Sequence, residues 1–105
     1  MIEGIKINLG GTEYIVPPLN FKSLKRLQPI IESLSQIDIT MTDKQIDDIA
    51  EIVHAAISRN YPDFTKEQIL DVLDLGNIGP ILASILGASG VKKVLLGERE
   101  ADKNL

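Results

Sequence analysis

The chain has 105 residues, enough for one domain with a single hydrophobic core. Hydrophobic residues make up 44% of it and aromatic residues only 4%, so isoleucine, leucine and valine must build that core. Cysteine is absent, which excludes disulfides and thiolate chemistry and fits a reducing compartment. The net charge of −4 argues against a nucleic acid partner, because such binding depends on clustered lysine and arginine.

Two further properties of the whole chain bear on location and partners. No apolar run approaches the roughly 18 residues that span a bilayer, and no secretory signal opens the chain, so we expect a cytoplasmic protein without a membrane partner. Bases gather in residues 22–26 and acids in residues 42–74. This polarity is compatible with self-association, although a solvated acidic helix face explains the same acids and is the interpretation we favour.

Residues 2–16 predict a two-stranded β-hairpin. Apolar residues alternate with other types in the first half, and residues 12–16 are rich in strand-forming types. Gly10-Gly11 lies between the two halves and suits the positive backbone angles of a tight turn.

Hydrophobic periodicity then predicts four helices. The first begins at Asn20, a good N-cap, and Pro29 inside it should kink the helix or split it near residues 27–28. The second and third begin at Thr42 and Thr65, each followed three residues later by glutamine, as in a capping box.

Helix ends carry their own signals. The second helix should end near Asn60, because Pro62 disfavours helical geometry in the residue before it. Gly76 suits a left-handed stop for the third helix. The fourth should begin within residues 77–80 and end at Gly87 or Gly90.

The predicted fold class is therefore mainly α, with about four helices in a small bundle and a short N-terminal β-hairpin. We expect one domain over residues 1–96 and a disordered polar tail over 97–105. The apolar stripes of the first two helices begin at Phe21 and Ile46, and Ile52 and Ala56 widen the second stripe. The predicted core is Ile5, Ile7, Leu24, Leu27, Ile31, Ile49, Val53, Ile57, Ile69, Leu73, Ile81, Leu82 and Ile85.

No group of residues predicts chemistry. His54, the only histidine, has Glu51 and Ser58 at helical spacing, which suits a local hydrogen bond, and no nucleophile motif accompanies it. Asp47, Asp48 and Glu51 lack the calcium loop pattern, and no glycine-rich phosphate loop is present. We therefore expect no enzyme activity, no catalytic residue, no metal and no cofactor.

Two sets of apolar residues are candidates for partner binding. Tyr61 and Phe64 flank a proline turn and form either an exposed aromatic anchor or an internal staple between two helices. We favour the staple, because the chain has few other large residues for its core. The second candidate is a strip near the C-terminus, interrupted by Lys92-Lys93 and made of Val91, Val94, Leu95 and Leu96.

Two segments, Tyr14-Ile15-Val16-Pro17-Pro18-Leu19 and the stretch RNYPDFTKEQILDVLDLGN from Arg59 to Asn77, resemble tail assembly chaperones of long-tailed phages and prophages. The resemblance covers residues 12–90. It implies a non-enzymatic protein of the host cytoplasm that binds the tape measure protein, or another tail protein, during virion morphogenesis. It also implies absence from the finished virion and, for many such genes, a longer frameshifted product. The alternatives are a structural tail or connector component and a small helical protein-binding module.

Overall fold

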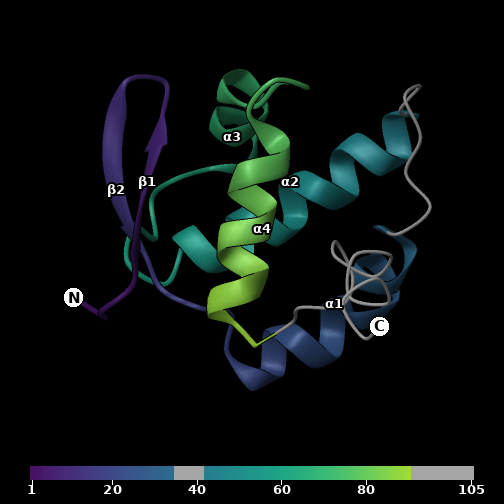
Figure 1. Cartoon of the computed structure of the whole chain (residues 1–105), viewed down its shortest axis with the longest axis horizontal. Coiled ribbons are helices and arrows are strands. Elements are labelled where there is room, and N and C mark those ends of the chain that lie inside the picture. The colour runs from purple at the N-terminus through teal and green to yellow at the C-terminus, as the bar shows by residue number, and fades with distance from the viewer. Residues whose placement is uncertain (35–41, 91–105) are drawn as a thin grey trace, which may run out of the picture.

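The computed structural model describes residues 1–34 and 42–90, which form a two-stranded hairpin followed by four helices (Figure 1). This confirms the mainly α fold class. The predicted tail, residues 97–105, and the predicted strip within residues 91–96 lie outside the described residues. The elements are β1 Ile5–Leu9, β2 Thr12–Val16, α1 Phe21–Ser33, α2 Asp43–Ile57, α3 Lys66–Val72 and α4 Ile78–Ala88.

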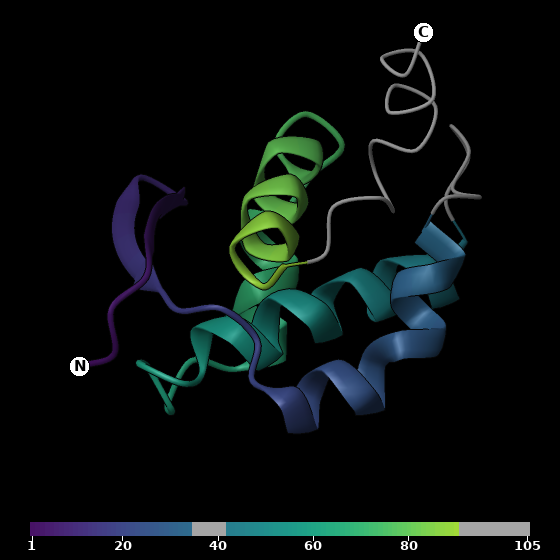
Figure 2. The same cartoon turned by 60° about the horizontal axis from the view of Figure 1, so that its bottom comes forward.

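Helix α2 is the centre of the molecule. It contacts the other three helices and β2, and Figure 2 shows α4 on one side of it and α1 on the other. Small alanine side chains let these neighbours approach its backbone closely, and the helix is buried on more than one side, consistent with the apolar stripe that Ile52 and Ala56 widen. Its buried residues are Ile49, Ala50, Ile52, Val53, Ala55, Ala56 and Ile57.

The hairpin has the predicted turn. Gly10 and Gly11 have φ angles of 61° and 89°, and both must be positive in the tight turn that matches the twist of two antiparallel strands. β1 and β2 pair from Ile5 opposite Val16 to Leu9 opposite Thr12. One face of the hairpin joins the core through Ile7, Leu9 and Val16.

Side chains from the turn after α2 attach the hairpin to the helices. The Asn60 amide donates to the carbonyl oxygens of Ile2 and Ile15 at 2.8 and 2.9 Å and accepts from the Ile2 N–H at 2.8 Å. The Tyr61 hydroxyl accepts from the Ile15 N–H at 3.0 Å, and Arg59 donates to the Pro18 carbonyl. A two-stranded hairpin is marginal alone, so these bonds explain why Arg59-Asn60-Tyr61 matters to the architecture.

Helix α1 continues through Pro29, so the predicted split is wrong. The alternative prediction of a kink is confirmed, because the ribbon of α1 changes direction in its second half (Figure 2). Proline produces such a bend by removing one backbone hydrogen bond and crowding the preceding turn.

Most residues of the predicted core are buried, and several apolar residues that remain partly or largely exposed lie in the first turn or at the end of an element. Phe21 is 84% exposed because it is the first residue of α1, and Ile46 is 41% exposed in the first turn of α2. Both begin predicted apolar stripes, although neither was in the predicted core. Three residues of the predicted core are half-buried and pack against the core from its edge: Ile5, Leu24 and Leu73.

The predicted glycine stop of α3 is wrong. Leu73 ends the helix with an extended backbone, and Gly76 has no positive φ. The carboxylate of Asp74 instead accepts from the N–H groups of Gly76 and Asn77 at 2.8 and 2.9 Å, while the Asn77 amide donates to the Val72 carbonyl at 2.8 Å. Side chains therefore satisfy the backbone groups that a left-handed glycine would otherwise have satisfied.

The remaining helix ends agree better with the sequence. Asn20, Thr42 and Thr65 cap their helices as predicted, and the two threonines form complete capping boxes. Helix α4 begins at Ile78 and is followed by Gly90 with a φ of 91°, whereas Gly87 lies within the helix. Helix α2 stops at Ile57, a few residues before the predicted end.

Candidate functional site

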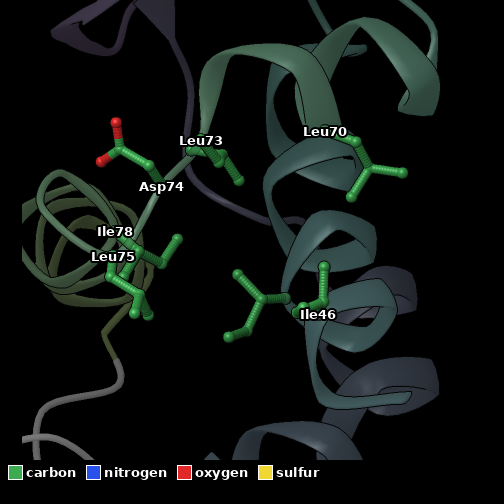
Figure 3. Close-up of a pocket in the computed structure, with 7 residues that line it drawn as sticks. Ile46, Leu70, Leu73, Asp74, Leu75 and Ile78 are labelled. Atoms are coloured by element: carbon green, nitrogen blue, oxygen red, sulfur yellow. The ribbon is translucent and has the colours of Figure 1, made fainter. Parts of the chain in front are cut away.

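The described part of the chain has an open apolar groove between the N-terminal half of α2, helix α3 and the start of α4 (Figure 3). We call it the α2–α3–α4 groove. It encloses about 250 Å³. Its lining residues are Ile46, Ile49, Leu70, Leu73, Asp74, Leu75 and Ile78.

Three large aliphatic side chains of the groove reach solvent. Leu75 is 67% exposed, Ile46 41% and Leu70 36%. In Figure 3 the apolar side chains point toward one another across the groove, whereas the Asp74 carboxylate turns away from them. That carboxylate is engaged by the backbone of its own turn. The groove therefore offers a mainly apolar surface.

Local structure explains how these side chains come together. Ile69 is fully buried and anchors α3 to the core, and the next residue, Leu70, lies about 100° further around the helix and so faces the groove. The turn held by Asp74 and Asn77 then reverses the chain and brings Leu75 to the opposite wall.

Glu51 on α2 links α1 and α3 outside the groove. Its carboxylate accepts from Arg26 at 3.1 Å and from Lys66 at 3.2 Å, and all three side chains are partly exposed. Partial burial raises the pKa of Glu51, but the hydrogen bonds and positive charges of Arg26 and Lys66 outweigh it and hold that pKa below its usual value.

Glu51→Gln is expected to lower the free energy of unfolding by less than about 1 kcal/mol near neutral pH, since both ion pairs are exposed. A depressed carboxyl pKa stabilises the fold above the unfolded-state pKa and loses that effect as pH falls through the folded-state pKa. The difference between wild type and variant should therefore shrink from about pH 5 to about pH 3. Urea unfolding across this range measures it, and a difference that grows on acidification would contradict the assignment.

The predicted aromatic candidates pack against the hairpin. Tyr61 and Phe64 each meet the ring of Tyr14 edge to face, with ring centroids 5.2 Å apart. Both rings are half-buried and neither lines the groove. These contacts join the turn after α2 to the hairpin and not one helix to another, so the predicted staple between two helices and a partner-binding role for Tyr61 and Phe64 both stay predictions. The other candidates, Val91, Val94, Leu95 and Leu96, lie outside the described residues.

His54 has a structural contact. Its Nε2 lies 2.9 Å from the carbonyl oxygen of Phe64, so the ring links α2 to the turn before α3 rather than to Glu51 or Ser58, the partners suggested by spacing. Within residues 1–34 and 42–90, no three acidic or histidine side chains cluster closely enough to hold a metal ion. No helix in the same ranges is both long enough and apolar enough to cross a membrane.

The groove was not predicted, although the sequence contains a sign of it. Helix α3 has only seven residues, yet Ile69, Leu70 and Val72 on it are all apolar, and it buries only Ile69. Leu75 stands in a polar turn with no periodic partner. The packing of α3 and α4 decides which of these apolar residues stay exposed to solvent.

Comparison with known protein families, curated proteins and solved structures identifies no relative of this chain. No family model matches the chain, and neither curated proteins nor solved structures give a significant match.

Proposed function

We propose that this protein is a non-enzymatic tail assembly chaperone of a phage, acting in the host cytoplasm, and that it binds an apolar helical segment of the tape measure protein in the α2–α3–α4 groove. The observation that carries the proposal is the grouping of Ile46, Leu70 and Leu75, which remain at the surface of one groove after folding. Contiguous exposed apolar surface of this kind marks sites of protein interaction.

The chaperone role follows from simple physics. An apolar segment of a long client aggregates unless another surface covers it, and the groove supplies such a surface. The net charge of −4 favours the solubility of a complex that contains apolar client segments. Several copies along one client would hold it with more avidity than a single weak contact.

The resemblance of Tyr14–Leu19 and Arg59–Asn77 to phage tail chaperones supplies the identity of the client in this proposal. In the structure these segments hold the hairpin to the helices and form α3, so they support the scaffold that carries the groove. A structural component of the tail would use the same groove but remain in the particle.

The test is co-expression with the tape measure protein of the same genome, followed by pull-down and measurement of complex mass. We expect a soluble complex with wild type and at least about tenfold less captured client with Leu75→Gln, because a central apolar contact contributes on the order of 1–2 kcal/mol. Phe21→Gln is the matched control, since Phe21 is also exposed but lies on α1 outside the groove.

Two results would contradict the proposal. A tape measure protein that stays soluble alone and is not captured would remove the chaperone role. Detection of this protein in purified virions would assign it to the tail structure instead.

A further inference from the structure

Acidic side chains border the groove along α2 and α3. Asp43 stands three residues before Ile46, and Glu67 three residues before Leu70, so each acid lies beside its groove residue on the same helix face. Asp71 follows Leu70 directly. All three acids are exposed.

These acids are not neutralised by the ion pairs of the described residues. Lys44 pairs with Asp48 at 2.8 Å and Lys66 pairs with Glu51 at 3.2 Å, so the two nearest lysines in sequence are bound elsewhere. Asp74 adds a further negative charge at the edge of the groove. The apolar floor is therefore bordered by negative charge that no ion pair of the described residues offsets, and such charge raises the local concentration of positively charged groups.

The shape of the groove favours a helix as its occupant. Its walls are mainly helices, whose backbone groups are bonded internally, so they offer no free edge to which a strand could add. A cavity of roughly 150 Å³ holds benzene, so the groove's 250 Å³ has room for one or two aliphatic side chains. Side chains one turn apart on a helix supply such a pair.

We propose that the occupant of the α2–α3–α4 groove is an amphipathic helix that carries lysine or arginine on both sides of its apolar stripe. The inference rests on the proposed function and adds the chemistry by which the client segment is recognised. Leucine or isoleucine anchors fill the apolar floor, and flanking bases meet Asp43 on α2 and Glu67 and Asp71 on α3. Exposed charge pairs of this kind speed association and are screened by salt.

The test uses two synthetic helical peptides of about 18 residues, or five turns, with the same leucine stripe. One has lysine and the other glutamate at the flanking positions. Fluorescence anisotropy measures their binding to the full chain. We expect the lysine peptide to bind at least about tenfold more tightly, and to lose most of this advantage between about 0.05 M and about 0.5 M salt.

Charge variants locate the effect. Glu67→Gln combined with Asp71→Asn should weaken binding of the lysine peptide several-fold. Glu3→Gln combined with Glu13→Gln removes the same amount of charge, from the segment before β1 and from β2, and should leave binding unchanged. Leu75→Gln should weaken both peptides. Thermal melts of each variant establish that it is folded.

Equal affinities, preference for the glutamate peptide, or no binding of either peptide would overturn the proposal. A concentration-dependent dimer that Leu75→Gln abolishes would also overturn it, because a second copy would then fill the groove.

The proposed function is tested separately. If tape measure capture requires Leu75 but ignores salt and the Glu67 and Asp71 changes, the chaperone proposal stands and the charge inference fails. If the lysine peptide binds but the tape measure protein is not captured, the charge inference stands and the chaperone proposal fails.

Discussion

Val53→Asp is expected to abolish cooperative unfolding of the domain. Val53 is 1% exposed in the middle of α2, the helix against which the other three pack. An aspartate there would bury a carboxylate that has no positive charge or hydrogen-bond donor to pair with it, at a cost of several kcal/mol. A domain of this size has only about 5–15 kcal/mol of stability in total, so this cost removes much of it. Circular dichroism during heating measures the result, and we expect a shallow curve without a transition.

Ile46→Asp is the matched control for this change. Ile46 lies two turns earlier on the same apolar stripe of α2, yet it is 41% exposed in the groove. The aspartate there remains in water, so the free energy of unfolding should change by less than about 1 kcal/mol. A normal transition for Val53→Asp, or unfolding of both variants, would show that the buried face of α2 has been assigned wrongly.

Ile69→Ala should lower the free energy of unfolding by about 2–5 kcal/mol, the usual range for removing a large aliphatic side chain from a closed core. Ile69 has no exposed surface and is the buried residue of α3. Its loss should therefore detach α3 from α2 as well as leave a cavity. We expect faster hydrogen exchange in α3 than in α2, together with weaker peptide binding, since α3 carries Leu70 of the groove and Leu73 follows it directly.

Leu70→Ala provides the comparison on the same helix. Leu70 is the next residue and is 36% exposed, so its truncation should cost less than about 1 kcal/mol of stability while still weakening binding in the groove. Urea unfolding of the two variants separates the effects. Equal destabilisation by Ile69→Ala and Leu70→Ala would mean that α3 is not held through Ile69.

Features that depend on a few neighbouring residues could be predicted from the chain alone. The caps at Asn20, Thr42 and Thr65 each join a side chain to a backbone N–H three residues later, and the Gly10-Gly11 turn needs only the conformational freedom of its own residues. Such interactions span one turn of chain, so they form wherever the local sequence permits. Element order and the mainly α class followed from them and from hydrophobic periodicity.

The candidate site could not be predicted in the same way. Ile46 and Val53 fit one stripe, and Ile69 and Leu70 are equally apolar, yet one member of each pair is buried and the other lines the groove. Periodicity states which face of a helix is apolar, but burial also requires that another element cover that part of the face. The contacts of Asn60 and Tyr61 with β2 likewise join residues more than 40 positions apart.

The sequence by itself thus determined the hairpin, the four helices, the N-terminal caps of α1, α2 and α3, and most of the core, because short-range hydrogen bonds and apolar spacing specify these locally. Only the tertiary structure decided that Tyr61 and Phe64 pack on Tyr14 and that Ile46, Leu70 and Leu75 share one groove. Those outcomes depend on how α2, α3 and α4 meet, and side chains from distant parts of the chain compete for the same limited core volume.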